Sequence, residues 1–249
     1  HGVNTDGLQI KQGEKSFFWS GKYHNDMNSR DTLDTQLNVL ADFDPIIPDN
    51  YQDCDYLMLG NLTPDIQRTV LNRLTKRPKL VVMDTMNFWM DIVLDSLKET
   101  ISMVDVLTIN DEEARQLSGE YSLVNASRKI MEMGPKFLVI KKGEHGALLF
   151  HKERIFSAPA LPLEVVFDPT GAGDSFAGGF MGYIASTDDT SFDNMKNAVI
   201  VGSALASFTV EKFGPERLIG LERNDIAERI KAFRRLTEFT LELSPGQEA

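Results

Sequence analysis

The sequence predicts an α/β protein in which a mostly parallel β-sheet lies between two layers of helices. Three observations lead to this prediction. Strand-like and helix-like segments alternate from residue 55 onward, one strand-like segment is an unbroken apolar run, and a glycine-rich turn precedes an apolar helical pattern within residues 168–180. Alternating strands and helices form right-handed crossovers, which make the strands parallel and place helices on both faces of the sheet.

The predicted strands of this series are short and apolar. They cover residues 55–60, 79–84, 104–110, 136–141 and 147–150. Among these, the run from Leu80 to Met83 has no polar residue, which is typical of a strand buried on both faces. A turn at residues 143–146 leads into the last strand.

The predicted helices follow the strands with helical spacing of apolar residues. They cover residues 63–76, 90–99, 111–117, 123–133 and 194–214, and a further helix begins near Asp174. The first of them has clear start signals, because Thr63 suits the N-cap and Pro64 suits the first helical position. The C-terminal residues 244–249 are expected to form a frayed tail.

The first forty residues have a different pattern. Short strand-like segments at residues 8–10, 16–19 and 36–40 are separated by polar turns and precede the strand–helix series. We therefore expect a small β-sheet region over residues 1–45 and an α/β domain over residues 46–249, with an irregular N-terminal meander as the alternative. The chain is long enough for one large α/β domain.

The composition excludes several classes of partner. The formal net charge of −11 argues against binding to nucleic acid or to an anionic membrane surface. No apolar stretch approaches the 18 residues that a transmembrane helix needs. The single cysteine, Cys54, excludes an internal disulfide and fits a reducing cytoplasm.

The run Asp-Pro-Thr-Gly-Ala-Gly-Asp at residues 168–174 has the features of an anion-binding site. Gly171 and Gly173 allow backbone conformations in which successive N–H groups point into one space. A helix that starts nearby adds its own unpaired N–H groups and the positive end of its dipole. Asp174 places a carboxylate beside this site, so the run suits phosphoryl transfer to an alcohol, which needs a base and hydrogen-bond donors for the moving charge.

This run resembles the C-terminal signature of the ribokinase (PfkB) family of carbohydrate kinases, with Pro169 in the place of a commoner threonine. The resemblance covers most of the chain and implies a ribokinase-like three-layer domain with a small β-sheet lid. It also implies an ATP- and Mg²⁺-dependent kinase in which Asp174 takes a proton from the acceptor hydroxyl. The N–H groups of Gly171, Ala172 and Gly173 would hold the developing phosphate charge, and Thr170 would contact the nucleotide.

Asn110 and Glu113 match the family's Asn-x-x-Glu motif at the end of a predicted strand. The resemblance implies that Glu113 holds Mg²⁺ through water and that Asn110 faces a phosphate, and hard oxygen ligands suit this ion. Asn and Glu are also common at helix starts, where they cap the helix and complement its dipole. The sequence alone favours this second interpretation, and the position of the motif between other family landmarks favours the first.

The segment from Lys141 to Gly146 resembles the family's glycine turn that lies against the ATP phosphates and ribose. Gly143 would let the backbone approach the nucleotide, and Lys141 or Lys142 would offset phosphate charge. A hairpin turn of this composition needs no function. We assign no catalytic role to His145. No Gly-x-x-x-x-Gly-Lys-Ser/Thr motif is present, so a P-loop enzyme is excluded.

Two further segments resemble family landmarks. Asn87, in the segment after the strand that ends at Asp84, is a candidate substrate residue, and a structural helix start explains it equally well. The family often has a cation soon after; here Phe88 and Trp89 follow, which argues against a phosphorylated sugar substrate. The small residues of the helix at 194–214 would lie beside the adenine, with helix packing as the alternative. The candidate nucleotide contacts there are Ser203, Ala204 and Ser207.

The sequence therefore predicts a sugar kinase, with a nucleoside kinase of the same fold as the first alternative. Aromatic residues of the lid region could stack on a nucleobase; they are Phe17, Phe18, Trp19 and Tyr23. A non-catalytic nucleotide-binding protein is the alternative from another class, and the intact run that ends at Asp174 argues against it.

Three further expectations concern ions, assembly and the substrate site. The resemblance implies a monovalent cation such as K⁺ near Asp168 and a homodimer formed through the lid. It also implies that the family's Gly-Gly stretch and sugar-binding acid would precede His1, so that part of the substrate site lies outside this sequence.

Overall fold

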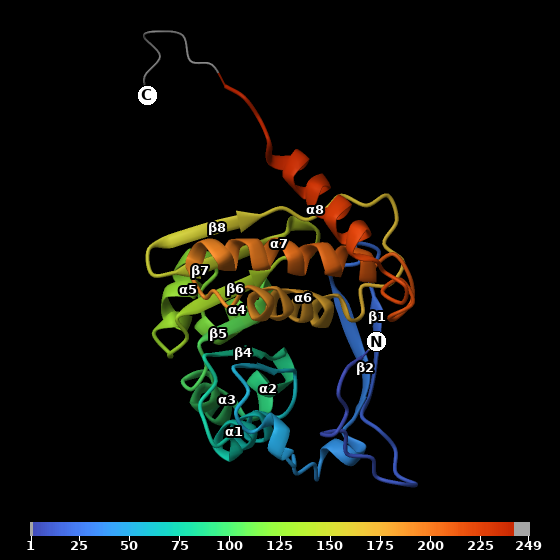
Figure 1. Ribbon diagram of the computed structural model, residues 1–249, viewed down its shortest axis with the longest axis vertical. Coiled ribbons are helices and arrows are strands. Elements are labelled where there is room, and N and C mark those ends of the chain that lie inside the picture. The colour runs from blue at the N-terminus through green and yellow to red at the C-terminus, as the bar shows by residue number, and fades with distance from the viewer. Residues whose placement is uncertain (1, 242–249) are drawn as a thin grey trace.

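The computed structural model describes residues 2–241, and its central feature is a six-stranded sheet with the order β3-β4-β5-β6-β7-β8 (Figure 1). The first four strands are parallel, and the last two are antiparallel to their neighbours. The prediction of a mostly parallel sheet is confirmed. The strands are β3 (Tyr56–Leu59), β4 (Leu80–Asp84), β5 (Val106–Asn110), β6 (Phe137–Lys141), β7 (Ala147–His151) and β8 (Arg154–Ala158).

Helices cover both faces of this sheet because alternate side chains of its strands are apolar on both sides. On one face, Val81 and Met83 of β4 pack against the helices of the first half. These are α1 (Pro64–Arg73), α2 (Asn87–Ile92), α3 (Leu94–Ile101), α4 (Asp111–Ser118) and α5 (Leu123–Met131). On the other face, Leu80 and Val82 pack against α6 (Ala172–Thr187) and α7 (Phe192–Thr209). The result is a three-layer domain.

The two helices α6 and α7 lie together on their face of the sheet (Figure 1) and approach each other closely. A Cβ atom at Gly202 of α7 would lie 2.7 Å from the Phe176 carbonyl oxygen of α6, and one at Gly179 of α6 would lie 2.9 Å from Leu205 Cδ1. Real Cβ atoms do not come this close to backbone, so packing alone requires the smallest residue at Gly202. After α7, α8 (Arg223–Thr237) packs against its C-terminal half.

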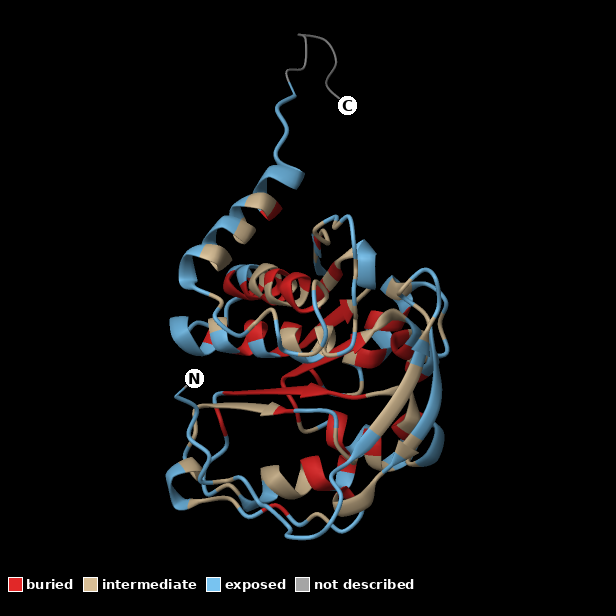
Figure 2. Cartoon of the chain, turned by 90° about the vertical axis from the view of Figure 1, so that its right-hand side faces the viewer, coloured by how far each residue is buried: buried red, intermediate tan, exposed pale blue. Residues whose placement is uncertain are grey.

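A separate two-stranded antiparallel sheet is formed by β1 (Phe18–Tyr23) and β2 (Arg30–Gln36). Figure 2 shows this ribbon mostly tan and pale blue beside the red central strands, so it is much less buried than they are. The expectation of a small sheet in this region is confirmed. Two short 3₁₀ turns, η1 (Asn38–Leu40) and η2 (Asp49–Tyr51), connect it to the main domain.

The expected strand boundaries in this region were partly wrong. Residues 8–10 form no strand, residues 38–40 form η1, and β2 begins at Arg30, well before the predicted segment at residues 36–40. The reason is that β2 has the sequence RDTLDTQ and is mostly exposed on both faces. A strand without a buried face has no apolar alternation by which it can be recognised.

Three other elements differ from the predictions. The helix expected at residues 90–99 is two helices, α2 and α3, which are separated at Val93 by a non-helical backbone conformation. The helix expected at residues 194–214 ends at Thr209, and the sequence analysis predicted neither β8 nor α8. The expected frayed tail at residues 244–249 lies outside the described residues. Within residues 2–241, no helix combines the length and the apolar character that crossing a bilayer would require.

Candidate active site

Three adjacent parallel strands end in a polar residue at the same edge of the sheet. Asp84 ends β4, Asn110 ends β5 and Lys141 ends β6. Ligands of open α/β sheets bind at this edge, outside the carboxyl ends of the strands. The glycine-rich run at residues 168–174 leads into α6 at the same place, because Gly173 lies against the Lys141 side chain.

The central contact of this edge is an ion pair between Lys141 and Asp84. Lys141 Nζ lies 3.1 and 3.2 Å from the two carboxylate oxygens of Asp84. Only 18% of the lysine side chain and 8% of the aspartate side chain are exposed. A Cβ atom at Gly173 would lie 3.4 Å from the same Nζ, so the ammonium group lies between Asp84 and the start of α6.

Lys141 keeps its positive charge in this partly enclosed position. Burial alone would lower the pKa of its ammonium group, but the negative charges of Asp84 and Glu113 outweigh burial and raise the pKa above its ordinary value. The sequence analysis gave Lys141 or Lys142 as a cation that offsets phosphate charge, and Lys141 is the one that lies at the glycine-rich run. Asp84, which holds the lysine there, begins the segment in which Asn87 was the candidate substrate residue, but the sequence analysis gave Asp84 no role of its own.

Asn110 and Glu113 form a capping box at the start of α4. The Asn110 N–H donates to Glu113 Oε2 at 2.8 Å, and the Glu113 N–H donates to Asn110 Oδ1 at 2.7 Å. Both residues therefore fill the structural role that the sequence analysis gave as the alternative. Glu113 is 3% exposed, and burial raises its pKa to about 7 against the opposing effects of Lys141 and the Asn110 N–H.

Asp174 lies in the first turn of α6, which begins at Ala172, two residues before the expected start. Gly171 is the N-cap and adopts a left-handed conformation, with φ of +82°, that favours glycine. Asp174 is exposed to solvent, although protein atoms surround part of its carboxyl group. Partial burial and then the charge of Asp84 raise the pKa of its carboxyl group, while Lys141 opposes the rise.

Hydrogen bonds hold the loop before α6 and the first turn of that helix in place. Asp168 Oδ1 accepts the Thr170 N–H at 2.9 Å, and the Ala172 N–H donates to the Pro169 carbonyl oxygen at 3.1 Å. Thr209, at the end of α7, donates its hydroxyl to Ser175 Oγ or to the Leu205 carbonyl oxygen, at 2.7 and 3.2 Å. These contacts fix the start of α6. Because the Ala172 N–H already donates to the Pro169 carbonyl oxygen, it is not available to a phosphate in this conformation.

The turn between β6 and β7 contains η3 (Gly143–His145) and closes with a hydrogen bond from the Lys142 N–H to the Gly146 carbonyl oxygen at 2.7 Å. Gly143 and Gly146 both have positive φ. A Cβ atom at Gly146 would lie 2.0 Å from the Ala158 carbonyl oxygen, so contact with β8 explains this glycine without a ligand. His145 is exposed.

The three residues predicted to contact the nucleotide from α7 differ in their surroundings. Ala204 has no exposed surface, and Ser207 is 8% exposed. Ser207 Oγ donates to the Ala204 carbonyl oxygen at 2.7 Å and accepts a hydrogen bond from Arg229 of α8 at 3.0 Å. Packing therefore accounts for Ala204 and Ser207 in this conformation. Ser203 is half-buried and keeps a surface that a ligand can reach.

Asn87 points toward α4 rather than toward the ion pair. Its Nδ2 donates to Gln116 Oε1 at 2.6 Å, and Gln116 in turn donates to Asp91 at 2.7 Å. Asn87 is also the first residue of α2, in agreement with the helix-start alternative. Within residues 2–241, no three His, Cys, Asp or Glu side chains gather closely enough to bind a metal ion by themselves.

A family model for the pfkB family of carbohydrate kinases matches residues 1–219. The chain belongs to this family. Among curated relatives of this pfkB family chain, a cytidine kinase of Thermococcus kodakarensis is 34% identical over 186 residues, which cover 72% of the chain and 64% of the relative. A ribokinase of Staphylococcus aureus is 30% identical over 49% of the chain and 40% of the relative. The chain thus spans less than two thirds of the length of these relatives.

Solved structures confirm the ribokinase-like fold of this pfkB family chain. A ribokinase of Thermotoga maritima has a TM-score of 0.68 at 23% identity, covering 89% of the chain and 72% of that structure. A nucleoside kinase of Methanocaldococcus jannaschii has a TM-score of 0.66 at 20% identity, covering 88% of the chain and 69% of that structure. At these identities the likeness concerns the fold.

We expect Lys141→Met to lower the free energy of unfolding by about 3 kcal/mol, because it leaves the buried Asp84 and Glu113 carboxylates without their cation. Lys142→Met is the matched control, since its side chain forms no ion pair within residues 2–241 and its loss should cost less than about 0.5 kcal/mol. Urea unfolding of both variants measures the difference. Equal losses of stability would show that the ion pair does not stabilise the fold.

Proposed function

We propose that this protein transfers a phosphoryl group from ATP to a hydroxyl group of a sugar or sugar-like small molecule. The observation that carries the proposal is the position of Asp174 in the first turn of α6, directly after the Gly-Ala-Gly run, with the Lys141 ammonium group beside Gly173. A base, helix N–H groups and a cation then lie around one space. Family membership supports the same activity.

In this proposal Asp174 accepts the proton of the acceptor hydroxyl. The hydroxyl oxygen forms a bond to the γ-phosphorus of ATP while the bond from that phosphorus to the bridging oxygen breaks, and ADP leaves with that oxygen. The raised pKa of Asp174 brings the carboxylate closer to the pH at which it can take up a proton. The N–H groups at the start of α6 and the Lys141 ammonium group offset the charge that develops on the phosphoryl oxygens.

Mg²⁺ would enter with the nucleotide and neutralise phosphate charge. The residues present fit an ion held indirectly. Glu113 offers a carboxylate near Lys141 and Asp84, but it is buried and one of its oxygens accepts the Asn110 N–H, so contact through water is the arrangement we propose. Asn110 would face a phosphate. A monovalent cation near Asp168 is a further proposal, and one oxygen of that carboxylate already accepts the Thr170 N–H.

A nucleoside is the second candidate for the acceptor. The likeness to a cytidine kinase extends over more of this chain than the likeness to a ribokinase does, which favours this alternative. In the lid, the guanidinium carbon of Arg30 lies over the Trp19 ring, 5.7 Å from the ring centroid, whereas Phe17 and Phe18 are exposed and can offer an aromatic face to a base. Exposed aromatic residues of the lid can equally pack against another protein surface.

The small sheet of β1 and β2 supports the division into a lid region, residues 1–45, and a kinase domain, residues 46–249. We also propose that the lid joins two copies of the chain. Apolar side chains on the lid region stay exposed in the single chain, although Tyr23 lies against Thr170 of the kinase domain in the same chain. The exposed ones include Leu8, Ile10, Phe17, Phe18 and Leu33. A reducing cytoplasm remains our proposal for the location, from the single free cysteine.

We expect the full-length protein to turn over ATP in the presence of Mg²⁺ and one member of a panel of pentoses, hexoses and ribonucleosides. ADP formation that depends on the acceptor is the measurement, and the phosphorylated product identifies the acceptor class. ATP binding without turnover on any member of the panel would contradict the proposed transfer and favour a non-catalytic nucleotide-binding protein.

We expect Asp174→Asn to preserve the fold and ATP binding but to lower kcat by about 10²–10⁴-fold, the usual contribution of a positioned base. Glu164→Gln is a control for loss of a carboxylate, because Glu164 is exposed in the loop that precedes the glycine-rich run. Steady-state kinetics with the natural acceptor measure the effect. A kcat near that of the wild type would remove Asp174 from the role of base.

We expect sedimentation of the full-length protein at tens of micromolar to show a dimer, because the small lid sheet cannot bury its apolar residues alone. Phe18→Ser combined with Leu33→Ser should yield a monomer with an unchanged fold. A strict monomer of the wild-type protein, with and without substrate, would rule out this assembly.

A further inference from the structure

The turn of the lid between β1 and β2 contacts the turn between β6 and β7. Asn28 Nδ2 donates to Glu144 Oε1 at 2.9 Å, and the Glu144 N–H donates to Asn28 Oδ1 at 3.3 Å. One side-chain amide therefore binds both the side chain and the backbone of a residue that lies 116 positions away in the sequence. Two elements that the sequence places in separate regions are joined here by a two-point polar contact.

The Asn28 side chain lies where a side chain at Gly143 would begin. A Cβ atom at this position would lie 2.2 Å from Asn28 Oδ1, and the residue has φ of +52°. The sequence analysis predicted that the nucleotide approaches the backbone at this glycine. In the structure the Asn28 side chain fills that space.

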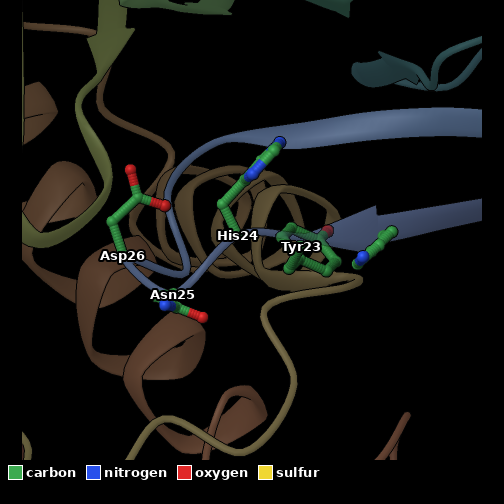
Figure 3. Close-up of a pocket in the computed structure, with 5 residues that line it drawn as sticks. Tyr23, His24, Asn25 and Asp26 are labelled. Carbon is green, nitrogen blue, oxygen red and sulfur yellow. The ribbon is translucent and has the colours of Figure 1, made fainter.

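The lid turn holds Asn28 in position by its own hydrogen bonds. Asp26 Oδ1 accepts the N–H groups of both Asn28 and Ser29 at 3.1 Å, and the His24 N–H donates to the Ser29 carbonyl oxygen at 3.0 Å. Figure 3 shows this turn, in which residues from Lys22 to Asp26 line a hollow of about 430 Å³. These hydrogen bonds hold the backbone that carries Asn28 in the conformation from which its side chain reaches the β6–β7 turn.

A second contact comes from the same end of the lid. Tyr23 OH lies 3.4 Å from Thr170 Oγ1, in the loop before α6. Thr170 and Gly143 are both predicted nucleotide contacts, and the lid turn touches both. The residues of the contact are largely exposed, and its hydrogen bonds are few. Contacts of this kind open at low cost in free energy, so a ligand can displace them.

We propose that Asn28 and the β6–β7 turn form a latch that excludes the nucleotide. In the state described here the lid turn is docked on Gly143 and Thr170, and a nucleotide that uses these residues displaces Asn28 and releases the lid turn. Nucleotide binding and lid docking at this position are therefore mutually exclusive, and each weakens the other by the same factor. In this scheme Asn28 competes with the nucleotide for the space beside Gly143 and takes no part in the chemical step. The inference rests on the proposed function for its nucleotide.

The test measures hydrogen exchange of residues 17–36 and the Kd of AMP-PCP with Mg²⁺ in the full-length protein. In the wild type, AMP-PCP should accelerate exchange in the lid. In Asn28→Ala, exchange should be fast without the nucleotide, and the Kd should be about three- to tenfold lower, as expected when one or two exposed hydrogen bonds no longer compete. Asn25→Ala, in the same turn, is the matched control and should behave like the wild type.

A second variant separates the latch from a general loosening of the lid. Glu144→Ala removes the partner on the β6–β7 turn, so it should lower the Kd as Asn28→Ala does, and the double variant should bind no more tightly than either single variant. Slower lid exchange with AMP-PCP, or equal Kd values for Asn28→Ala and Asn25→Ala, would overturn the latch. Failure of the wild type and of every variant to bind AMP-PCP would instead overturn the proposed function, and the latch with it.

Discussion

The ion pair between Lys141 and Asp84 is the interaction on which the candidate site depends. It joins the last residues of β6 and β4 across β5, and it holds an ammonium group against the start of α6. Three carboxylates, those of Asp84, Glu113 and Asp174, lie close enough to this lysine to affect its pKa. Without the lysine this edge of the sheet would concentrate negative charge at the place where the proposed substrate brings phosphate.

The same cluster shows how structural and functional roles are combined in one set of residues. Glu113 and Asn110 cap α4, and their hydrogen bonds fix the end of β5 relative to that helix. The capping role does not conflict with an indirect metal contact, because only one oxygen of Glu113 is needed for the cap. Likewise Gly146 is required by its close contact with the backbone of β8, whereas Gly143 has a positive φ and lies against the Asn28 side chain. A glycine in this turn therefore identifies close backbone approach, but not the group that approaches.

The lid is packed less tightly than the main sheet that carries the site. Strand β2 is mostly exposed and β1 is mostly half-buried. Asn28 of the turn between them donates to Glu144 in η3, and Tyr23 at the end of β1 accepts a hydrogen bond from Thr170 in the loop before α6. The central strands β4, β5 and β6 are almost fully buried between two apolar layers and are more rigidly held than the lid. Motion of the lid against a fixed site is the behaviour that this contrast in packing favours.

The sequence determined much of the main domain. The apolar run of β4, the start of α1 at Pro64 and the glycine-rich run before α6 predicted a parallel sheet with a phosphate site at one edge, and the structure confirms the sheet. These features are local, because burial on both faces and a glycine turn are visible in consecutive residues. The sequence did not predict the bounds of β2, the presence of β8 or the break at Val93. The two strands have exposed faces, and the break depends on packing.

The tertiary structure decided which polar residues meet. The pairing of Asp84 with Lys141 joins residues 57 positions apart, and the contact of Asn28 with Glu144 joins residues 116 positions apart. No periodicity in the sequence encodes such contacts. The first depends on the order of the strands in the sheet, and the second depends on the position of the lid turn relative to the main domain. It also decided that Ser207 is enclosed, because Arg229 of α8 donates to Ser207 Oγ and lies over the Phe208 ring. This docking of α8 onto α7 depends on side-chain packing between the two helices and not on the pattern of either helix alone.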